Sequence, residues 1–404
     1  METLHPHCCG LDVHKQTVVA CRLADGEKST RTFKTSTAAL RELVDWLKEE
    51  GCTHVAMEST GSYWKPVYNL LEDHFTLVLV NTRHLKLVPG RKSDVKDAEW
   101  IAELLQHGLL RASFVPSREE RELRELSRYE TSLKAERTAE VNRIQKVLEG
   151  ANIKLTSVAS NVVGASGRAM LEAIVAGVDD PRLLAGLARG RLRAKQDDLA
   201  EVLAGLVQPH QRFMLQQQLR HVDELDRHIE QVAAEIGDRL APFVGTRERL
   251  QTIPGMGPRG SEVVLCEIGP RVERFPTAQH LASWAGLCPG SDESAGKNRS
   301  GRTPKGNRAV KVALVQAAHA AARTQTYLGA QYRRLRRRIG AQKAAVAVAH
   351  SMLVVIYHVL RDHTDFHDLG PNYFEPRDRE RVVRSHIKRL ERLGFAVTLT
   401  PSSA

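Results

Sequence analysis

Residues 10–15, in which an apolar-leaning strand leads into Asp12, constrain the fold of this chain more than any other segment. The residue pattern around it predicts paired strands over 7–13 and 17–23, with a third strand over 28–34. Because the second strand folds back onto the first, Asp12 is expected at the centre of a sheet. Taken alone, such an aspartate would usually be a surface acid.

The following residues predict an alternation of helices and strands. Apolar residues spaced three and four apart indicate helices over 37–50 and 63–74. Strands are expected over 53–58 and 76–81, and the second is apolar throughout, as a buried strand would be. With a further helix over 94–107, this order predicts a three-layer α/β domain.

Three more acids can converge on Asp12. Glu58 ends a predicted strand, and Asp94 and Asp97 lie three apart on one face of the helix that Asp94 opens. Four carboxylates at one point would bind a hard cation such as Mg²⁺. The alternative is that Asp94 and Asp97 are solvated acids favoured by the helix dipole, with Ser93 as the N-cap.

Composition narrows the class of partner. The net charge is +11 and the pI about 9.5, which favours polyanions such as DNA, RNA or an anionic membrane face. A generally basic housekeeping protein would show the same excess. Six cysteines without a C-x-x-C pair suit a reducing cytoplasm and argue against structural zinc. The apolar run 344–360 contains His350, Ser351 and His358, so we expect a buried helix there and no membrane span.

The middle of the chain predicts a helical arm. Residues 117–150 form a long charged helix, and apolar residues step by three or four along 216–240, as in a coiled coil. We therefore expect an antiparallel helical arm over 118–245. A plain helical bundle would give the same pattern.

Two later stretches are suited to phosphate contacts. Residues 253–257 resemble the hairpin of a helix-hairpin-helix, in which Gly255 and Gly257 would let the backbone approach a phosphate. A structural corner is the alternative. An irregular loop then carries basic residues without an acid from 296 to 311: Lys297, Arg299, Arg302, Lys305, Arg308 and Lys311. A solvated loop is the alternative here. Arginines at 333–338 form a second basic cluster between two apolar helices.

These motifs together resemble the DEDD-type transposases, or recombinases, of bacterial insertion sequences that are guided by a bridge RNA. The resemblance is carried by the sequences around Asp12, Glu58, Asp94 and Asp97, by Ile-Pro-Gly-Met-Gly, and by the motifs Trp284-Ala-Gly-Leu-Cys-Pro, Glu293-Ser294 and Lys305-Gly306-Asn307. It covers nearly the whole chain.

The resemblance implies a function and a set of site residues. The four acids would bind Mg²⁺ in an RNase H-like, RuvC-like domain, and Ser294 would be the nucleophile that forms a phosphoserine link to DNA. Ser291 and Ser300 lie close enough to remain alternatives. The family further implies donor and target DNA, a bridge RNA, and a cytoplasmic homo-oligomer, from dimer to tetramer, with active sites shared between protomers.

The expected architecture has four parts. An RNase H-like α/β domain over 1–117 precedes a coiled-coil arm over 118–245. A mainly helical transposase domain with the helix-hairpin-helix follows over 246–370, and a charged tail over 371–404. From the residues alone, two other functions stay open: a metal-only, resolvase-type nuclease that hydrolyses branched DNA, and a non-catalytic nucleic-acid scaffold.

Overall fold

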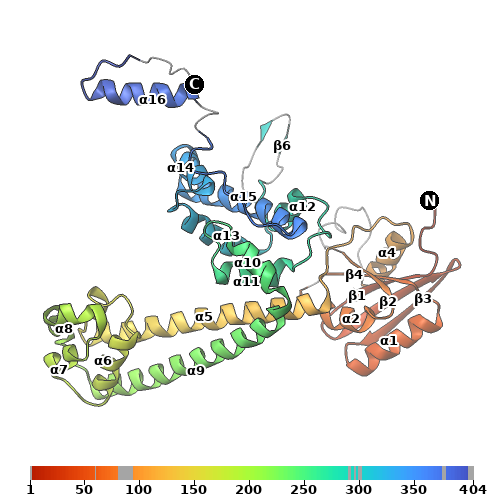
Figure 1. Cartoon of the computed structure of the whole chain (residues 1–404). Coiled ribbons are helices and arrows are strands. Elements are labelled where there is room, and N and C mark those ends of the chain that lie inside the picture. The colour runs from red at the N-terminus through yellow and green to blue at the C-terminus, as the bar shows by residue number, and fades with distance from the viewer. Residues whose placement is uncertain are drawn as a thin grey trace. The chain divides into compact units, whose positions relative to one another are not determined.

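The computed structural model describes residues 2–59, 61–80, 94–289, 293–294, 297–298, 303–374 and 379–398 (Figure 1). The chain divides into two compact units, Met1–Glu119 and Glu120–Ala404. The predicted domain boundaries within the second unit stay a prediction.

The first unit is built on a five-stranded mixed sheet with the order β3-β2-β1-β4-β5. The strands are β1 (Cys8–Val13), β2 (Thr17–Ala24), β3 (Glu27–Lys34), β4 (His54–Glu58) and β5 (Thr76–Val80). β1 pairs antiparallel with β2 and parallel with β4. The central strand is therefore the one that carries Asp12, as the sequence predicted.

Helices cover both faces of this sheet (Figure 1). α1 (Thr37–Glu49) and α2 (Trp64–Leu71) pack with one face through a core that includes Leu11, Leu43 and Met57. α4 (Asp94–Gln106) packs against the other face, where Ile101 and Leu105 meet Cys8 and Ala56. The predicted three-layer α/β domain is confirmed.

One expectation for this sheet is wrong. β5 was expected to be buried throughout, but it lies at the edge of the sheet, where only Leu79 and Val80 are buried. An edge strand has a ladder partner on one side only, so the start of β5 stays open to solvent. Apolar composition alone does not distinguish such a strand from a central one.

The second unit begins with two long antiparallel helices, α5 (Arg118–Gly150) and α9 (Pro209–Leu240) (Figure 1). Ion pairs fix their opposite directions, since Arg239 pairs with Glu122 at 2.9 Å while Arg137 pairs with Asp226. The predicted antiparallel pair of helices is confirmed. Knobs-into-holes packing, which would make the pair a coiled coil, stays a prediction.

A small helical cap closes the tip of this arm. Its elements are η1 (Leu155–Ser157), α6 (Ala165–Val175), α7 (Pro181–Gly186), η2 (Gly190–Lys195) and α8 (Gln196–Leu203). They enclose a core with Ile144 and Leu148 of α5 and Leu215 and Leu219 of α9. The tip therefore has a hydrophobic core of its own.

The remainder of the second unit is mainly helical. Its elements are η3 (Ala241–Phe243), α10 (Val244–Gln251), α11 (Pro258–Ile268), α12 (Ala278–Trp284), β6 (Glu293–Ser294), β7 (Lys297–Asn298), α13 (Arg308–Ala321), α14 (Tyr327–Ile339), α15 (Ala341–Asp362) and α16 (Arg379–Arg392). The arginines at 333–338 lie on α14, between the two expected apolar helices, and the segment that carries them is itself a helix. Leu328 and Tyr332 are buried on this helix and anchor it to the core.

α15 is the one helix in the described part of the chain that is long and apolar enough to span a membrane. More than half of its most apolar stretch is buried inside the protein, with Val348, Met352 and Ile356 fully covered. It packs against α12, α13 and α14 in the main core. This agrees with the expectation of a buried helix.

Candidate functional site

Two of the predicted acids lie at the same end of neighbouring strands. β1 and β4 run parallel, and Leu11 lies opposite Met57 in their register. Asp12 and Glu58 are the next residues on each strand, so both carboxylates come from the C-terminal end of this pair. Asp12 is buried and Glu58 half-buried. His14 Nε2 lies 2.9 Å from Asp12 Oδ2 and helps to fix that carboxylate.

Helix α4 lies directly on β1 because Gly10 has no side chain. A Cβ on Gly10 would stand 2.3 Å from the Ala98 carbonyl oxygen and 2.4 Å from the Ala102 nitrogen. Cys8, two residues earlier on the strand, contacts the Ala102 carbonyl, with 3.7 Å between sulfur and oxygen. The strand and the helix therefore run in opposite directions: from Cys8 to Gly10 the strand advances two residues, and its contact on α4 moves back one turn, from Ala102 to Ala98.

This antiparallel match extends to the acids. Two strand residues advance about 6.7 Å and four helical residues about 6 Å, so the two elements stay in register. The step that follows Gly10 on β1 reaches Asp12, and the turn that precedes Ala98 on α4 holds Asp94 and Asp97. The structure therefore brings the backbone of all four predicted acids to one end of the sheet.

The side chains do not yet define a metal centre. Asp97 is half-buried, and the side chain of Asp94 lies outside the described residues. Among the side chains that are described, no three of the types His, Cys, Asp and Glu lie close enough to hold a metal ion. The donor set consists of carboxylates only, which suits Mg²⁺ by its chemistry. The magnesium site stays a prediction.

The candidate nucleophile lies on a short hairpin in the second unit. Ser294 on β6 occupies the register position opposite Lys297 on β7. Its side chain and that of Lys297 are outside the described set, as are Ser291, Arg299, Ser300 and Arg302 entirely. The assignment of the serine therefore stays a prediction.

The chain segments before and after this hairpin, at Gly286 and at Thr303 to Gly306, contact each other at its base. A Cβ on Gly306 would stand 2.2 Å from the Gly286 nitrogen, so the two backbones touch. Lys311 Nζ donates to the Gly286 carbonyl at 3.2 Å and to Thr303 Oγ1 at 2.6 Å. Lys311 was predicted to contact phosphates, and in the structure it joins the two ends of the loop. Lys305 and Arg308 are exposed.

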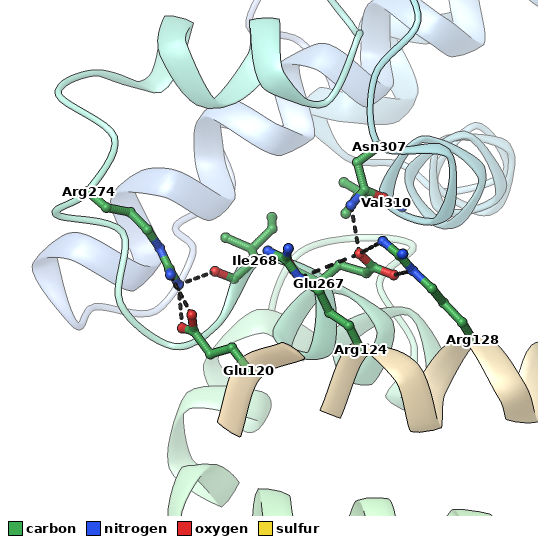
Figure 2. A network of polar contacts seen from close by, with 8 residues as sticks. All are labelled: Glu120, Arg124, Arg128, Glu267, Ile268, Arg274, Asn307 and Val310. Carbon is green, nitrogen blue, oxygen red and sulfur yellow. Dashed lines mark hydrogen bonds and ion pairs between the residues drawn. The ribbon is translucent and has the colours of Figure 1, made fainter. Parts of the chain in front are cut away.

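A buried glutamate ties this base to the arm, as Figure 2 shows. Glu267 on α11 is fully buried and accepts two hydrogen bonds from Arg128 of α5, at 2.7 and 2.9 Å. Asn307 Nδ2 donates to the same carboxylate at 2.6 Å, and its Oδ1 accepts from the Val310 N–H at 3.0 Å, which caps α13. The residue that follows the loop is thus fixed to the first helix of the arm.

A second arginine completes the network. Arg124 donates to the Glu267 carbonyl oxygen and lies over the Trp284 ring, 5.5 Å from its centroid. Burial lowers the pKa of Arg124 to about 10, so it remains charged at neutral pH. Beside it, Arg274 binds Glu120 and the Ile268 carbonyl (Figure 2). Sequence reasoning missed Glu267, although a lone acid among the apolar residues 263–268 was a visible signal.

Two protein-family models match this chain. One, described as a transposase of the DEDD type, matches residues 9–153, and one described as a transposase of the IS116/IS110/IS902 family matches residues 247–333. Together they span more than half of the sequence. The chain belongs to the IS110 family of transposases.

A relative from Streptomyces coelicolor supports this membership. It is named an insertion element IS110 uncharacterized 43.6 kDa protein and is 33% identical over 124 residues. The match covers 30% of this chain and 30% of the relative, so it spans less than a third of that protein's length.

The IS110 family match that begins at residue 247 includes the predicted helix-hairpin-helix. α10 and α11 are joined by residues 252–257, where Gly255 has a φ of +87°. A Cβ on Gly255 would stand 2.2 Å from the Ala317 carbonyl of α13, so packing accounts for this glycine. Nothing lies within 4 Å of the Cβ position on Gly257. This geometry favours the structural reading at Gly255, and phosphate binding at either glycine stays a prediction.

Proposed function

We propose that this IS110-family chain cuts and rejoins DNA strands during the movement of an insertion sequence. One observation supports this most directly: the two family matches cover the acid-bearing sheet and the part of the second unit that includes the Ser294 hairpin. A protein with the acids alone would be suited to hydrolysis. The presence of both parts favours strand transfer.

The proposed metal centre uses the carboxylates of Asp12, Glu58, Asp94 and Asp97. When bound there, Mg²⁺ would neutralise charge on the phosphate and lower the pKa of a coordinated hydroxyl. His14 holds the Asp12 carboxylate through the 2.9 Å contact. The RNase H-like fold assigned to this domain is part of the proposal.

Ser294 is the proposed nucleophile. Its Oγ would attack the phosphorus, the hydroxyl proton would leave to a base or to water, and the bond from phosphorus to one deoxyribose oxygen would break. The released deoxyribose hydroxyl recovers a proton. The serine phosphodiester retains the energy of the cut bond, so attack by another deoxyribose hydroxyl rejoins the strand and frees Ser294 without ATP.

The partners are proposed from the same family resemblance. Donor and target DNA would be the substrates, and pairing with a bridge RNA would select their sequences. The basic side chains Lys297, Arg299, Arg302, Lys305 and Arg308 would contact phosphates. A cytoplasmic homo-oligomer, from dimer to tetramer, would let the acids of one protomer act beside the serine of another.

A covalent-adduct assay tests this proposal. The protein is mixed with the element's non-coding RNA, labelled junction DNA and Mg²⁺, then denatured, and label that migrates with the protein is measured. We expect an adduct with the wild type and none with Ser294→Ala or Asp12→Asn. Ser291→Ala and Ser300→Ala serve as matched controls for the choice of serine.

Other outcomes would identify the alternative functions. Cut DNA without an adduct, unaffected by Ser294→Ala, would indicate a hydrolytic nuclease. Nucleic-acid binding that survives Asp12→Asn, with no cleavage by the wild type, would indicate a scaffold.

A further inference from the structure

The last turn of α14 carries three consecutive arginines, Arg336, Arg337 and Arg338. All three side chains are exposed. Within the described part of the chain, no acid lies within ion-pair distance of any of them. We refer to these three residues as the α14 arginine cluster. The matched family region ends at residue 333, so neither family model covers the cluster.

Elsewhere in this protein, arginines with structural roles have partners. Arg128 pairs with Glu267, Arg137 with Asp226 and Arg168 with Asp223. On α14 itself, Arg333 donates to the Thr324 carbonyl at 2.9 Å and so serves the fold. The three arginines of the cluster differ from these because no acid among the described side chains forms an ion pair with them.

The surrounding sequence also lacks negative charge. Between Glu293 and Asp362 there are lysines and arginines but no aspartate or glutamate. Arg337 lies four residues after Arg333, and Arg338 four after Arg334, which places like charges next to each other on the helix. A single cation would be enough to complement the dipole at this helix end. Like charges at this spacing repel one another, and a bound polyanion would offset that repulsion.

The direction of the side chains indicates the shape of that polyanion. Leu328, Tyr332 and Leu335 turn one face of α14 to the core. Consecutive helical residues point about 100° apart, so Arg337 faces away from the core while Arg336 and Arg338 point to either side. The helix end therefore presents cations on three sides, suited to phosphates on both flanks of a groove.

We propose that the α14 arginine cluster binds the phosphate backbones that border the major groove of duplex DNA. A helix with its side chains is about 10–12 Å across, and the major groove of B-form DNA is about 12 Å wide. The major groove of A-form RNA is too narrow to admit it. This assignment rests on the proposed action on DNA and adds a contact surface to it.

The test replaces all three arginines, Arg336→Gln, Arg337→Gln and Arg338→Gln, in the full chain. Affinity for a 30-base-pair DNA duplex and for an RNA duplex of the same sequence is measured from 50 to 300 mM salt. Each phosphate contact contributes about 0.9 to the slope of log affinity against log salt, so the slope for DNA should fall by about 2.7. The slope for the RNA duplex should change by less than about 0.9, the contribution of one phosphate contact.

The matched control removes the same charge at the arm tip, with Arg191→Gln, Arg193→Gln and Lys195→Gln, all exposed on η2. Its DNA slope should stay near the wild-type value. Equal losses in both variants would mean that net charge alone matters and would overturn the assignment. So would an unchanged DNA slope in the α14 variant, or a loss confined to RNA.

Two further measurements separate a loss of DNA binding from a loss of folding and from a failure of the proposed serine chemistry. The thermal unfolding midpoint of each variant should match the wild type, because glutamine and arginine have similar helix propensities. The covalent-adduct assay is run in parallel on the wild type. Salt-dependent DNA binding without an adduct would contradict the proposed serine chemistry and leave the DNA surface standing. An adduct together with an unchanged slope in the α14 variant would contradict the DNA surface and leave the proposed serine chemistry standing.

Discussion

Glu267 shows how one buried charge connects segments that are far apart in the sequence. Its carboxylate is held by Arg128, 139 positions earlier, and by Asn307, 40 positions later. Such a charge is tolerated in a core only when its hydrogen bonds are satisfied, and here every described contact serves that end. Loss of the charge would leave Arg124 and Arg128 without their shared counter-ion.

Glu267→Gln should lower the free energy of unfolding by about 2–3 kcal/mol, less than for a fully enclosed pair because Arg128 reaches solvent. Urea unfolding measures this change. Glu122→Gln is the matched control, since Glu122 pairs with Arg239 at the surface and its loss should cost less than about 1 kcal/mol. Similar losses for the two variants would contradict a special role for the buried network.

The cysteines give a second test at this scale. Burial raises the pKa of Cys8 to about 12, of Cys52 to about 11 and of Cys266 to about 12. Because the folded state favours the neutral thiol, their contribution to stability is complete below the ordinary value of 9.0. It is lost as the pH rises through 11 to 12.

At pH 8 these thiols should therefore resist alkylation in the native protein. Cys288, the one cysteine that is only partly buried, should react first. A thiol-reagent titration checks this: one fast thiol is expected in the folded protein and six in denaturant. Several fast thiols before unfolding would contradict the described core.

At the scale of elements, the packing of α4 on β1 depends on Gly10. Any side chain there would meet the backbone of α4 at Ala98 and Ala102. Displacement of the helix would move Asp94 and Asp97 away from Asp12. The arrangement of the proposed metal site thus depends on a residue that carries no functional group.

Gly10→Ala should destabilise the first unit by about 1–3 kcal/mol through overpacking, and it should reduce adduct formation more than it reduces DNA binding. Unfolding curves and the adduct assay measure both effects. Gly237→Ala is the control, because nothing lies within 4 Å of the Cβ position at this helical residue. That change should stabilise α9 by about 0.5–1 kcal/mol. Full adduct yield in Gly10→Ala would show that α4 does not position the acids.

The elements themselves were largely predictable, and the reasons are physical. Periodic apolar residues indicated α1, α5 and α9, an apolar run indicated α15, and the strand that carries Asp12 proved to be central. The edge position of β5 was missed because an apolar strand looks alike in both places. The pairing of Glu267 with Arg128 was missed because it depends on how distant helices pack, which local periodicity does not encode.

The candidate site was predictable only in part. The positions of Asp12 and Glu58 follow from strand ends, which the sequence marks clearly. The role of Lys311 does not follow, because a lysine in a basic loop looks the same whether it contacts a phosphate or a carbonyl. The structure shows it bound to Gly286 and Thr303.

At the scale of the whole molecule, the proposed DNA binding and the proposed cutting would rest on different groups. The +11 charge would attract phosphates at any metal concentration, whereas the proposed cutting requires the acidic site. Removal of Mg²⁺ with EDTA should therefore abolish adduct formation and leave DNA affinity within about twofold. Affinity is measured by anisotropy and adducts by gel in the same mixtures. Full adduct yield in EDTA would contradict the metal site.

The arm also has a mechanical consequence. Each of its two helices is about 50 Å long. A hydrophobic core holds the pair at each end: Leu123 and Ile236 belong to one core, and Ile144 and Leu215 belong to the other. Between these two cores, Leu133 and Leu225 are buried but belong to neither core. An ion pair between Arg137 and Asp226 also joins the helices there. Added salt weakens such an ion pair more than it weakens either hydrophobic core. We therefore expect the middle of the arm to bend more easily at high ionic strength, while its two ends stay firm.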